Sequence, residues 1–245
     1  MKDYNKSAKT LIEALPYIKK FRGKTIVLKF GGSIGSKEFS NFSRDLVLMK
    51  YVGINPVVVH GGGDEISKAL SKNNIKTSFV DGLRITCDET MKIVEMVLGR
   101  KVNKQIVSKI NSNGGSAIGL SGADGELLRV KKMKPIRKGV DLGRVGEITK
   151  VNTLLIKELL TSGHIPVIAP IGTNTKGLSF NINGDSAASK IASSLKAEKL
   201  IVLTNVEGIK DKNKKLISSL SKKQAKSLVK NGTIASGMVP KVKCL

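Results

Sequence analysis

Four short aliphatic runs in this chain each lead into a glycine. They are IVLKF before Gly31, PVVVH before Gly61, AIGLS before Gly122 and IPVIAP shortly before Gly172. Apolar residues that follow one another without alternation are typical of parallel strands buried on both faces of a sheet. Helical patterns lie between the runs, so the sequence predicts an α/β fold: a three-layer α/β/α sandwich with a mainly parallel central sheet.

Apolar residues recur at helical spacing between the strands. The ranges that this periodicity marks as helices are 8–21, 38–52, 64–73, 88–112, 152–162 and 218–230. Hairpins are expected at 77–86 and 126–150, and two further strands within GLSFNIN and KLIVL. A soft division falls at APIGTNTKG, which predicts two lobes, residues 1–175 and 176–245.

The net charge of +24 has two interpretations. One is an anionic partner such as nucleic acid or a phosphorylated ligand. The other, which we favour, is compositional bias, because 36 of the 43 basic residues are lysines scattered along the chain. Reading of base edges favours arginine, and stacking on single strands needs aromatic residues, which make up 4% of the chain. We therefore expect no nucleic-acid partner.

The residues that usually form metal sites or disulfides are few and far apart. Cys87, Cys244, His60 and His164 show no short spacing, so neither a structural zinc site nor a disulfide framework is expected. The N-terminus has no long apolar run and carries acidic residues, unlike a signal peptide. No stretch is long enough to span a bilayer. We expect a soluble cytoplasmic protein with no membrane partner and no metal site of its own.

Two glycine turns are candidates for an anion site. Gly31 and Gly32 follow the first expected strand, and Gly61–Gly63 follow the second, with a helix directly behind. Glycine lets backbone N–H groups approach an anion, and a helix N-terminus adds partial positive charge. One glycine after a strand is usually only turn chemistry, but two such turns in one sheet favour phosphate binding. Neither turn matches a P-loop or a G-x-G-x-x-G fingerprint.

Polar and charged residues elsewhere in the chain are further candidates. Lys29 interrupts an apolar strand, where its charge is costly unless it meets an anion or reaches the surface. Asp185 opens a helix, where it could be an N-cap. Asn181 and Asn183 would share one side of a strand. Arg84 could clamp a carboxylate, although an arginine in a hairpin is more often solvated.

These features occur in stretches that together resemble the amino-acid kinase family. In family order, the stretches are LIEALPYIKKFRGKTIVLKFGGS, PVVVHGGGDEI, FVDGLRIT, VNKQIV, GLSGADG, VGEITKVN, IPVIAPIG, FNINGDSAA and SGMVPKV. The resemblance implies an amino-acid kinase-like fold and transfer of the γ-phosphoryl group of ATP, with Mg²⁺, to the γ-carboxylate of N-acetyl-L-glutamate in arginine biosynthesis. LIEALPYIKKFRGKT, VDGLRIT and NINGDSAA point most specifically to this acceptor.

The resemblance also implies catalytic roles. Lys29 matches a lysine that contacts the transferring phosphoryl group, and Lys241 matches a second lysine on the nucleotide side. Asp185 matches an aspartate that holds both lysines in place. Because a carboxylate acceptor is already ionised, no general base is needed. His60 is therefore expected to be a packing or turn residue.

Binding roles follow in the same way. Phosphate contacts are implied for Gly31, Gly32 and Gly62. Acceptor contacts are implied for Gly61, Gly62, Gly63, Arg84 and Asn181, so Gly62 has both roles.

The resemblance implies a separate function for each lobe. Residues 1–175 would bind the acceptor and form a dimer, and residues 176–245 would bind the nucleotide. The helix at 8–21 resembles an extension that links dimers into hexamers. Family members continue past the position of Lys241, so we expect a shortened nucleotide lobe.

Two alternatives remain open. One is a related kinase that acts on glutamate, aspartate, carbamate or a carrier-linked aminoadipate. The other is a basic binding protein that keeps the fold without catalysis.

Overall fold

The computed structural model describes residues 4–31, 36–135, 139–204, 206–213, 215–234 and 242. Five strands form the central sheet, in the order β11 (Lys199–Val202), β1 (Thr25–Phe30), β2 (Asn55–His60), β8 (Ile165–Ala169) and β5 (Ala117–Ser121). All neighbouring strands in this sheet are parallel. The predicted parallel sheet is confirmed, and all five residues of β8 are buried, as a strand covered on both faces requires.

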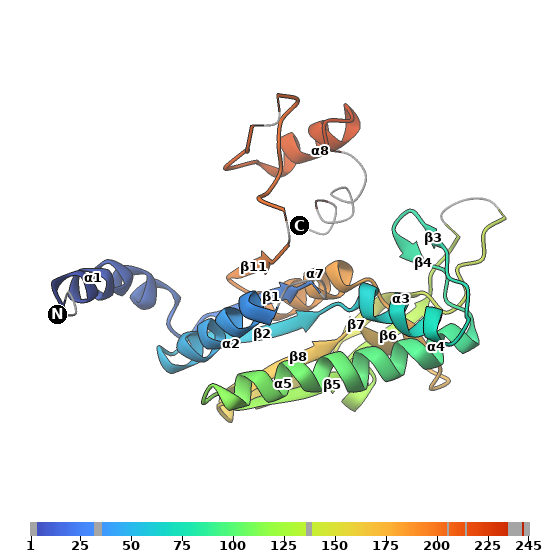
Figure 1. The fold of residues 1–245 in the computed structure, drawn as a ribbon, viewed down its shortest axis with the longest axis horizontal. Helices are drawn as coiled ribbons and strands as arrows, with labels where there is room; N and C mark the ends of the chain where they lie inside the picture. Colours follow the sequence, from blue (N-terminus) through green and yellow to red (C-terminus); the bar gives the residue numbers. More distant parts are fainter. Residues whose placement is uncertain are drawn as a thin grey trace.

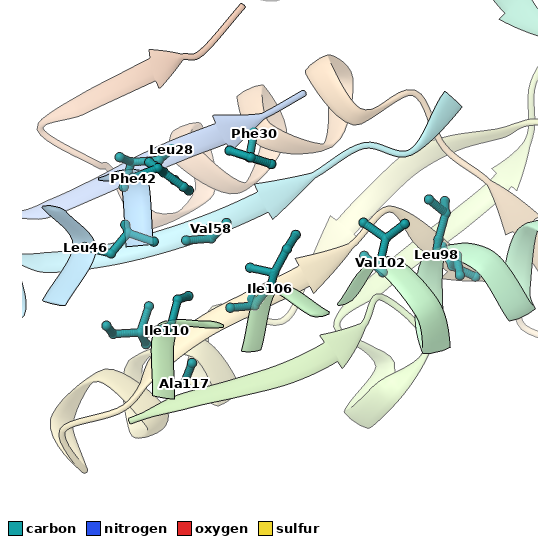
Figure 2. Packing of buried hydrophobic residues seen from close by; sticks show 14 of the residues in the cluster. Leu28, Phe30, Phe42, Leu46, Val58, Leu98, Val102, Ile106, Ile110 and Ala117 are labelled. Atoms are coloured by element: carbon teal, nitrogen blue, oxygen red, sulfur yellow. The ribbon is translucent and has the colours of Figure 1, made fainter. Parts of the chain in front are cut away.

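Helices cover both faces of the sheet. One face packs against α2 (Ser36–Tyr51), α3 (Gly63–Lys72), α4 (Asp88–Val94) and α5 (Asn103–Ser112). Figure 2 shows part of this packing, with Phe42 and Leu46 of α2 and Ile106 of α5 over Leu28 and Val58 of the strands. The other face packs against α6 (Thr153–Thr161) and α7 (Gly184–Leu195). Successive strand residues point to opposite cores, which gives the predicted three-layer sandwich.

A second sheet adjoins the first beyond the end of β8. Its strands are β10 (Ser179–Asn181), β9 (Ile171–Thr173), β6 (Leu128–Lys132) and β7 (Gly146–Val151), in that order. The pair β6–β7 is antiparallel, as predicted for 126–150, and a short 3₁₀ turn, η2 (Asp124–Glu126), precedes it. The predicted hairpin at 77–86 is formed by β3 (Phe79–Val80) and β4 (Leu83–Arg84).

The segment 88–112 differs from the single regular helix that was predicted. Its middle, η1 (Glu95–Val102), is a π-helix between α4 and α5. The extra width brings Leu98 against the glycine turn after β2, where a Cβ on Gly62 would lie 2.6 Å from Leu98 Cδ2. The helix is therefore deformed where it meets that turn, as π-helical segments often are near functional sites.

The two ends of the described chain lie outside the sandwich. Helix α1 (Tyr4–Phe21) continues through Pro16 and projects away from the sheet (Figure 1). Helix α8 (Lys222–Lys230) starts at a capping box formed by Ser221 and Gln224. None of the helices in the described ranges is both long and apolar enough to cross a bilayer.

Candidate active site

A pocket of about 260 Å³ opens at the carboxyl ends of β1 and β2. Open α/β sheets bind ligands at this edge. The hairpin β3–β4 and the start of α7 complete its walls. The pocket thus collects residues from segments that are widely separated in the sequence.

An ion pair lies at the bottom of this pocket. Lys29, the fifth residue of β1, places its Nζ 2.9 Å from Oδ1 of Asp185, and each side chain is about 10% exposed. The capping role considered for Asp185 belongs instead to Asn183, whose Oδ1 accepts from the backbone N–H groups of Asp185 and Ser186. Because Asn183 caps α7, the Asp185 carboxylate is directed to Lys29. A buried lysine held in this way keeps a positive charge at the pocket.

In the glycine turn after β2, the backbone N–H groups differ in whether the fold already uses them. The N–H of Gly61 donates to the carbonyl of Phe30 (2.9 Å), which leaves that amide committed to the sheet. Gly62 is the N-cap of α3, and its carbonyl accepts from Ile66. The N–H groups of Gly62 and Gly63 belong to the first turn of a helix, where no intrahelical acceptor exists. These two amides are therefore the anion-binding candidates of this turn.

Arg84 is buried, with 5% of its surface exposed, and lines the pocket from β4. Its guanidinium donates to Thr77 Oγ1 (2.6 Å), to Ser67 Oγ (2.8 Å) and to the Gly63 carbonyl (2.9 Å). Its Cζ lies 4.5 Å from the centre of the Phe79 ring. Burial lowers the pKa of Arg84, but an arginine remains charged at neutral pH. The guanidinium is fixed in position, unlike a solvated hairpin arginine.

Asn181, on β10, faces the same pocket. Its Nδ2 donates to Thr86 Oγ1 (3.2 Å), and that hydroxyl donates to the Arg84 carbonyl (2.8 Å). Thr86 is fully buried and was not predicted as a site residue. One hydroxyl group therefore connects the two residues expected to hold the acceptor.

His60, the last residue of β2, is fully buried beneath the turn. Its Nδ1 lies 2.9 Å from the Gly61 carbonyl oxygen, and its Nε2 lies 3.2 Å from Asn103 Nδ2. Burial lowers the pKa of His60 to about 4, and the hydrogen bond to Gly61 opposes that shift only partly. The imidazole is therefore neutral near pH 7.

The structure gathers most of the predicted site residues into one pocket. Its lining includes Lys29, Gly31, Gly61, Gly62, Gly63, Arg84, Asn181 and Asp185. Gly32 and Lys241 lie outside the described residues, so their predicted roles stay predictions. Within the described ranges, no group of three or more His, Cys, Asp or Glu residues could hold a metal ion.

Positive charge and backbone donors converge at the edge of a parallel α/β sheet, which is the arrangement of an enzyme that handles anionic groups. A family model described as the amino acid kinase family matches residues 24–245. The chain belongs to the amino acid kinase family.

Several similar proteins are named acetylglutamate kinase. Acetylglutamate kinase of Stutzerimonas stutzeri (strain A1501) is 52% identical in an alignment that covers 97% of this chain and 82% of that protein. Acetylglutamate kinase of Ruthia magnifica subsp. Calyptogena magnifica is also 52% identical, over 98% of this chain and 83% of that protein. The chain is thus similar to acetylglutamate kinases over nearly its whole length.

Solved structures share the fold. N-acetylglutamate synthase from Neisseria gonorrhoeae, complexed with coenzyme A and N-acetyl-glutamate, has a TM-score of 0.86 at 26% identity, covering 97% of this chain and 54% of that one. The protein smu.665 from Streptococcus mutans UA159 has a TM-score of 0.79 at 30% identity, covering 90% of this chain and 88% of that one.

Proposed function

We propose that this chain is a kinase that transfers the γ-phosphoryl group of ATP to the γ-carboxylate of N-acetyl-L-glutamate, in arginine biosynthesis. Relatives named acetylglutamate kinase, 49–52% identical over 97–98% of the chain, support this acceptor. The observation that carries the proposal is the buried pair Lys29–Asp185, which holds one cation beside Gly31 and the turn Gly61–Gly63 in the pocket that also contains Arg84 and Asn181.

The chemistry needs charge compensation more than proton transfer. The acceptor carboxylate is ionised at neutral pH, so it can attack without a base. The difficulty is that two anions must meet and that charge spreads over the phosphoryl oxygens in the transition state. Lys29 and the N–H groups of Gly31 and Gly62 would stabilise that charge in a site that is already ordered. We assign the same task to Gly32 and Lys241 from the resemblance.

The two ends of the acceptor would be held by different residues. We propose that Arg84 and Asn181 bind its α-carboxylate and neighbouring atoms, and that the turn Gly61–Gly63 faces its reactive end. Mg²⁺ would arrive with ATP, because it usually keeps substrate phosphates and water among its ligands. Its chemistry is to neutralise charge on the phosphates.

The test is to trap the acyl phosphate with hydroxylamine. Mg-ATP is supplied with N-acetylglutamate, glutamate, aspartate, carbamate or a carrier-linked aminoadipate in parallel reactions. Hydroxamate formed only with N-acetylglutamate is the expected result. Product with another acceptor would identify the chain as a different kinase of the same family. No product with any acceptor, together with salt-dependent binding to DNA or RNA, would favour the basic binding protein instead.

We also propose that the chain assembles into a dimer or hexamer and works in the cytoplasm. Four large apolar or aromatic side chains are exposed on α1, namely Leu11, Ile12, Leu15 and Tyr17, which supports self-association through this helix. The division of labour between residues 1–175 and 176–245 stays a prediction. Light scattering that finds a monomer would refute the assembly.

A further inference from the structure

We propose that His60 and Asn103 form a positioning pair that holds the peptide group between Gly61 and Gly62, so that the Gly62 N–H faces the transferring phosphoryl group. The inference rests on the proposed function for the identity of that anion. It assigns neither residue a contact with substrate. Both act through the backbone of the glycine turn.

Gly61 and Gly62 share a single peptide plane. The carbonyl of Gly61 and the N–H of Gly62 belong to the same planar group and point in opposite directions. His60 Nδ1 lies 2.9 Å from that carbonyl oxygen, beneath the turn. Fixing the carbonyl toward the buried imidazole therefore fixes the Gly62 N–H on the opposite side of the plane. Donation to the carbonyl also polarises the amide, which strengthens its N–H as a donor.

The two hydrogen-bond partners of His60 determine which ring nitrogen carries the proton. A carbonyl oxygen can only accept, so His60 Nδ1 must carry the hydrogen. Asn103 Nδ2 can only donate, so His60 Nε2 must be the acceptor, at 3.2 Å. Both contacts are satisfied by the neutral Nδ1–H tautomer alone. Asn103 thus selects the tautomer that holds the turn.

Asn103 is itself held in one orientation. Its Nδ2 also lies 2.9 Å from the carbonyl oxygen of Val167 and 3.3 Å from that of Leu120, on β8 and β5, so its two N–H bonds are shared among three acceptors. Reversing the amide would place Oδ1 against these oxygens. In the observed orientation, Oδ1 is buried without a donor among the described residues, at a cost of about 1–3 kcal/mol. An orientation kept in spite of an unpaired oxygen is consistent with a role in the site.

Close packing around Asn103 supports this interpretation. Its Oδ1 occupies the space that a Cβ on Gly119 would need, so the strand must carry glycine there. The residue follows directly on the π-helix, whose Leu98 packs against Gly62. The turn is thus fixed by a hydrogen bond through His60 and by contact with Leu98.

The tautomer can be measured directly by nitrogen NMR. The chain has two histidines, so ¹⁵N-labelled protein gives two imidazole spin systems, and His164→Gln identifies the signals of His60. We expect Nδ1 to be protonated and Nε2 unprotonated at pH 7. A protonated Nε2 would overturn the proposal. This measurement does not depend on enzymatic activity, so it stands even if the proposed function fails.

Paired variants test the positioning role. In His60→Asn, the side-chain amide nitrogen is bonded to Cγ, like the Nδ1 of histidine, so a donor to the Gly61 carbonyl can be kept. In His60→Gln, the amide nitrogen lies one bond further from the backbone, so this donor is misplaced. We expect His60→Asn to keep the Gly62 amide resonance near its wild-type position and His60→Gln to shift it. In the kinase assay, His60→Gln should lower kcat about 10- to 100-fold, because the transition state loses an aligned donor, and His60→Asn should recover most of that loss.

The other histidine of the chain, His164, provides a control for these variants. His164, at the amino end of β8, contacts Ser116 and lies outside the pocket lining, so His164→Gln should leave kcat unchanged. Equal amide shifts and equal kcat in His60→Asn and His60→Gln would reduce His60 to a packing residue. If wild-type protein gives no acyl phosphate, the proposed function fails, and the tautomer and the Gly62 resonance still decide the positioning role.

Discussion

The ion pair between Lys29 and Asp185 allows stability and catalysis to be separated by a double-mutant cycle. The cycle consists of Lys29→Met, Asp185→Asn and the double variant. At 2.9 Å and an effective dielectric constant of 20, the attraction between the two charges is about 6 kcal/mol. Desolvation offsets much of that, so the pair contributes far less to net stability.

Removing one partner leaves the other charge poorly compensated. The usual cost for a buried pair is about 3–5 kcal/mol, and we expect about 3 kcal/mol here because both side chains keep some exposure to the pocket. The double variant buries neither charge and should cost about the same as one single variant. The coupling energy is then about 2–3 kcal/mol, within the range for residues in contact.

Urea unfolding and the hydroxylamine assay should give different patterns. The double variant should recover stability relative to the sum of the single variants, whereas all three variants should lose kcat by about 10²-fold or more. Lys29→Met and the double variant remove the cation that faces the phosphoryl group, and Asp185→Asn removes the carboxylate that holds this cation in place. The exposed pair Glu65–Lys101, 2.8 Å apart, is the control, with an expected coupling below about 1 kcal/mol. Additive costs at Lys29 and Asp185 would refute the reasoning.

Three further predictions follow from single residues. Gly62→Ala should lower the free energy of unfolding by about 1–3 kcal/mol in urea titrations, because its Cβ would lie 2.6 Å from Leu98 Cδ2. Leu98→Ala should relieve this penalty, and an unchanged free energy of unfolding in Gly62→Ala would contradict the contact. Arg84→Lys keeps the charge but loses the two-pronged geometry, so KM for the acceptor should rise tenfold or more while KM for ATP stays constant; a rise in both would argue against acceptor binding. Burial lowers the pKa of His60 from 6.5 to about 4, so the unfolded chain binds a proton at this histidine more readily than the folded chain. The free energy of unfolding should therefore be highest above pH 6.5 and should fall by on the order of 3 kcal/mol as the pH is lowered to 4. His60→Asn should remove that loss in urea unfolding between pH 7 and 4; an unchanged slope would contradict it.

Local patterns in the sequence were enough to predict most of the fold. Apolar runs marked β1, β2 and β8, since parallel strands buried on both faces leave no alternation, and a similar run marked β5, although this edge strand is only partly buried. The short strand β9 was not predicted, because IGT has no hydrophobic pattern of its own and pairs only in the folded chain. The π-helix was not predicted either, because its width depends on packing against the glycine turn.

The pocket was predictable only in part. Lys29 was conspicuous because a charge inside an apolar strand needs an explanation. Thr86 and Asn103 carry no such signal, since a threonine after a hairpin and an asparagine in a helix are common. Their importance comes from contacts with Asn181 and His60, which are 95 and 43 residues away in the chain. For Asp185 the helix start was right, but the cap is Asn183.

The π-helix η1 has a consequence for insertions and deletions. A π-helix accommodates more residues per turn than an α-helix, because its hydrogen bonds run from i to i+5. The loss of one residue from Glu95–Val102 would therefore let the segment become α-helical while α4 and α5 keep nearly their present orientation, so that Met91 and Val94 stay in the core and Asn103 stays near His60. The change would fall on the widened part of the helix, from which Leu98 contacts Gly62. A one-residue deletion there should disturb the glycine turn more than the packing of α4 and α5.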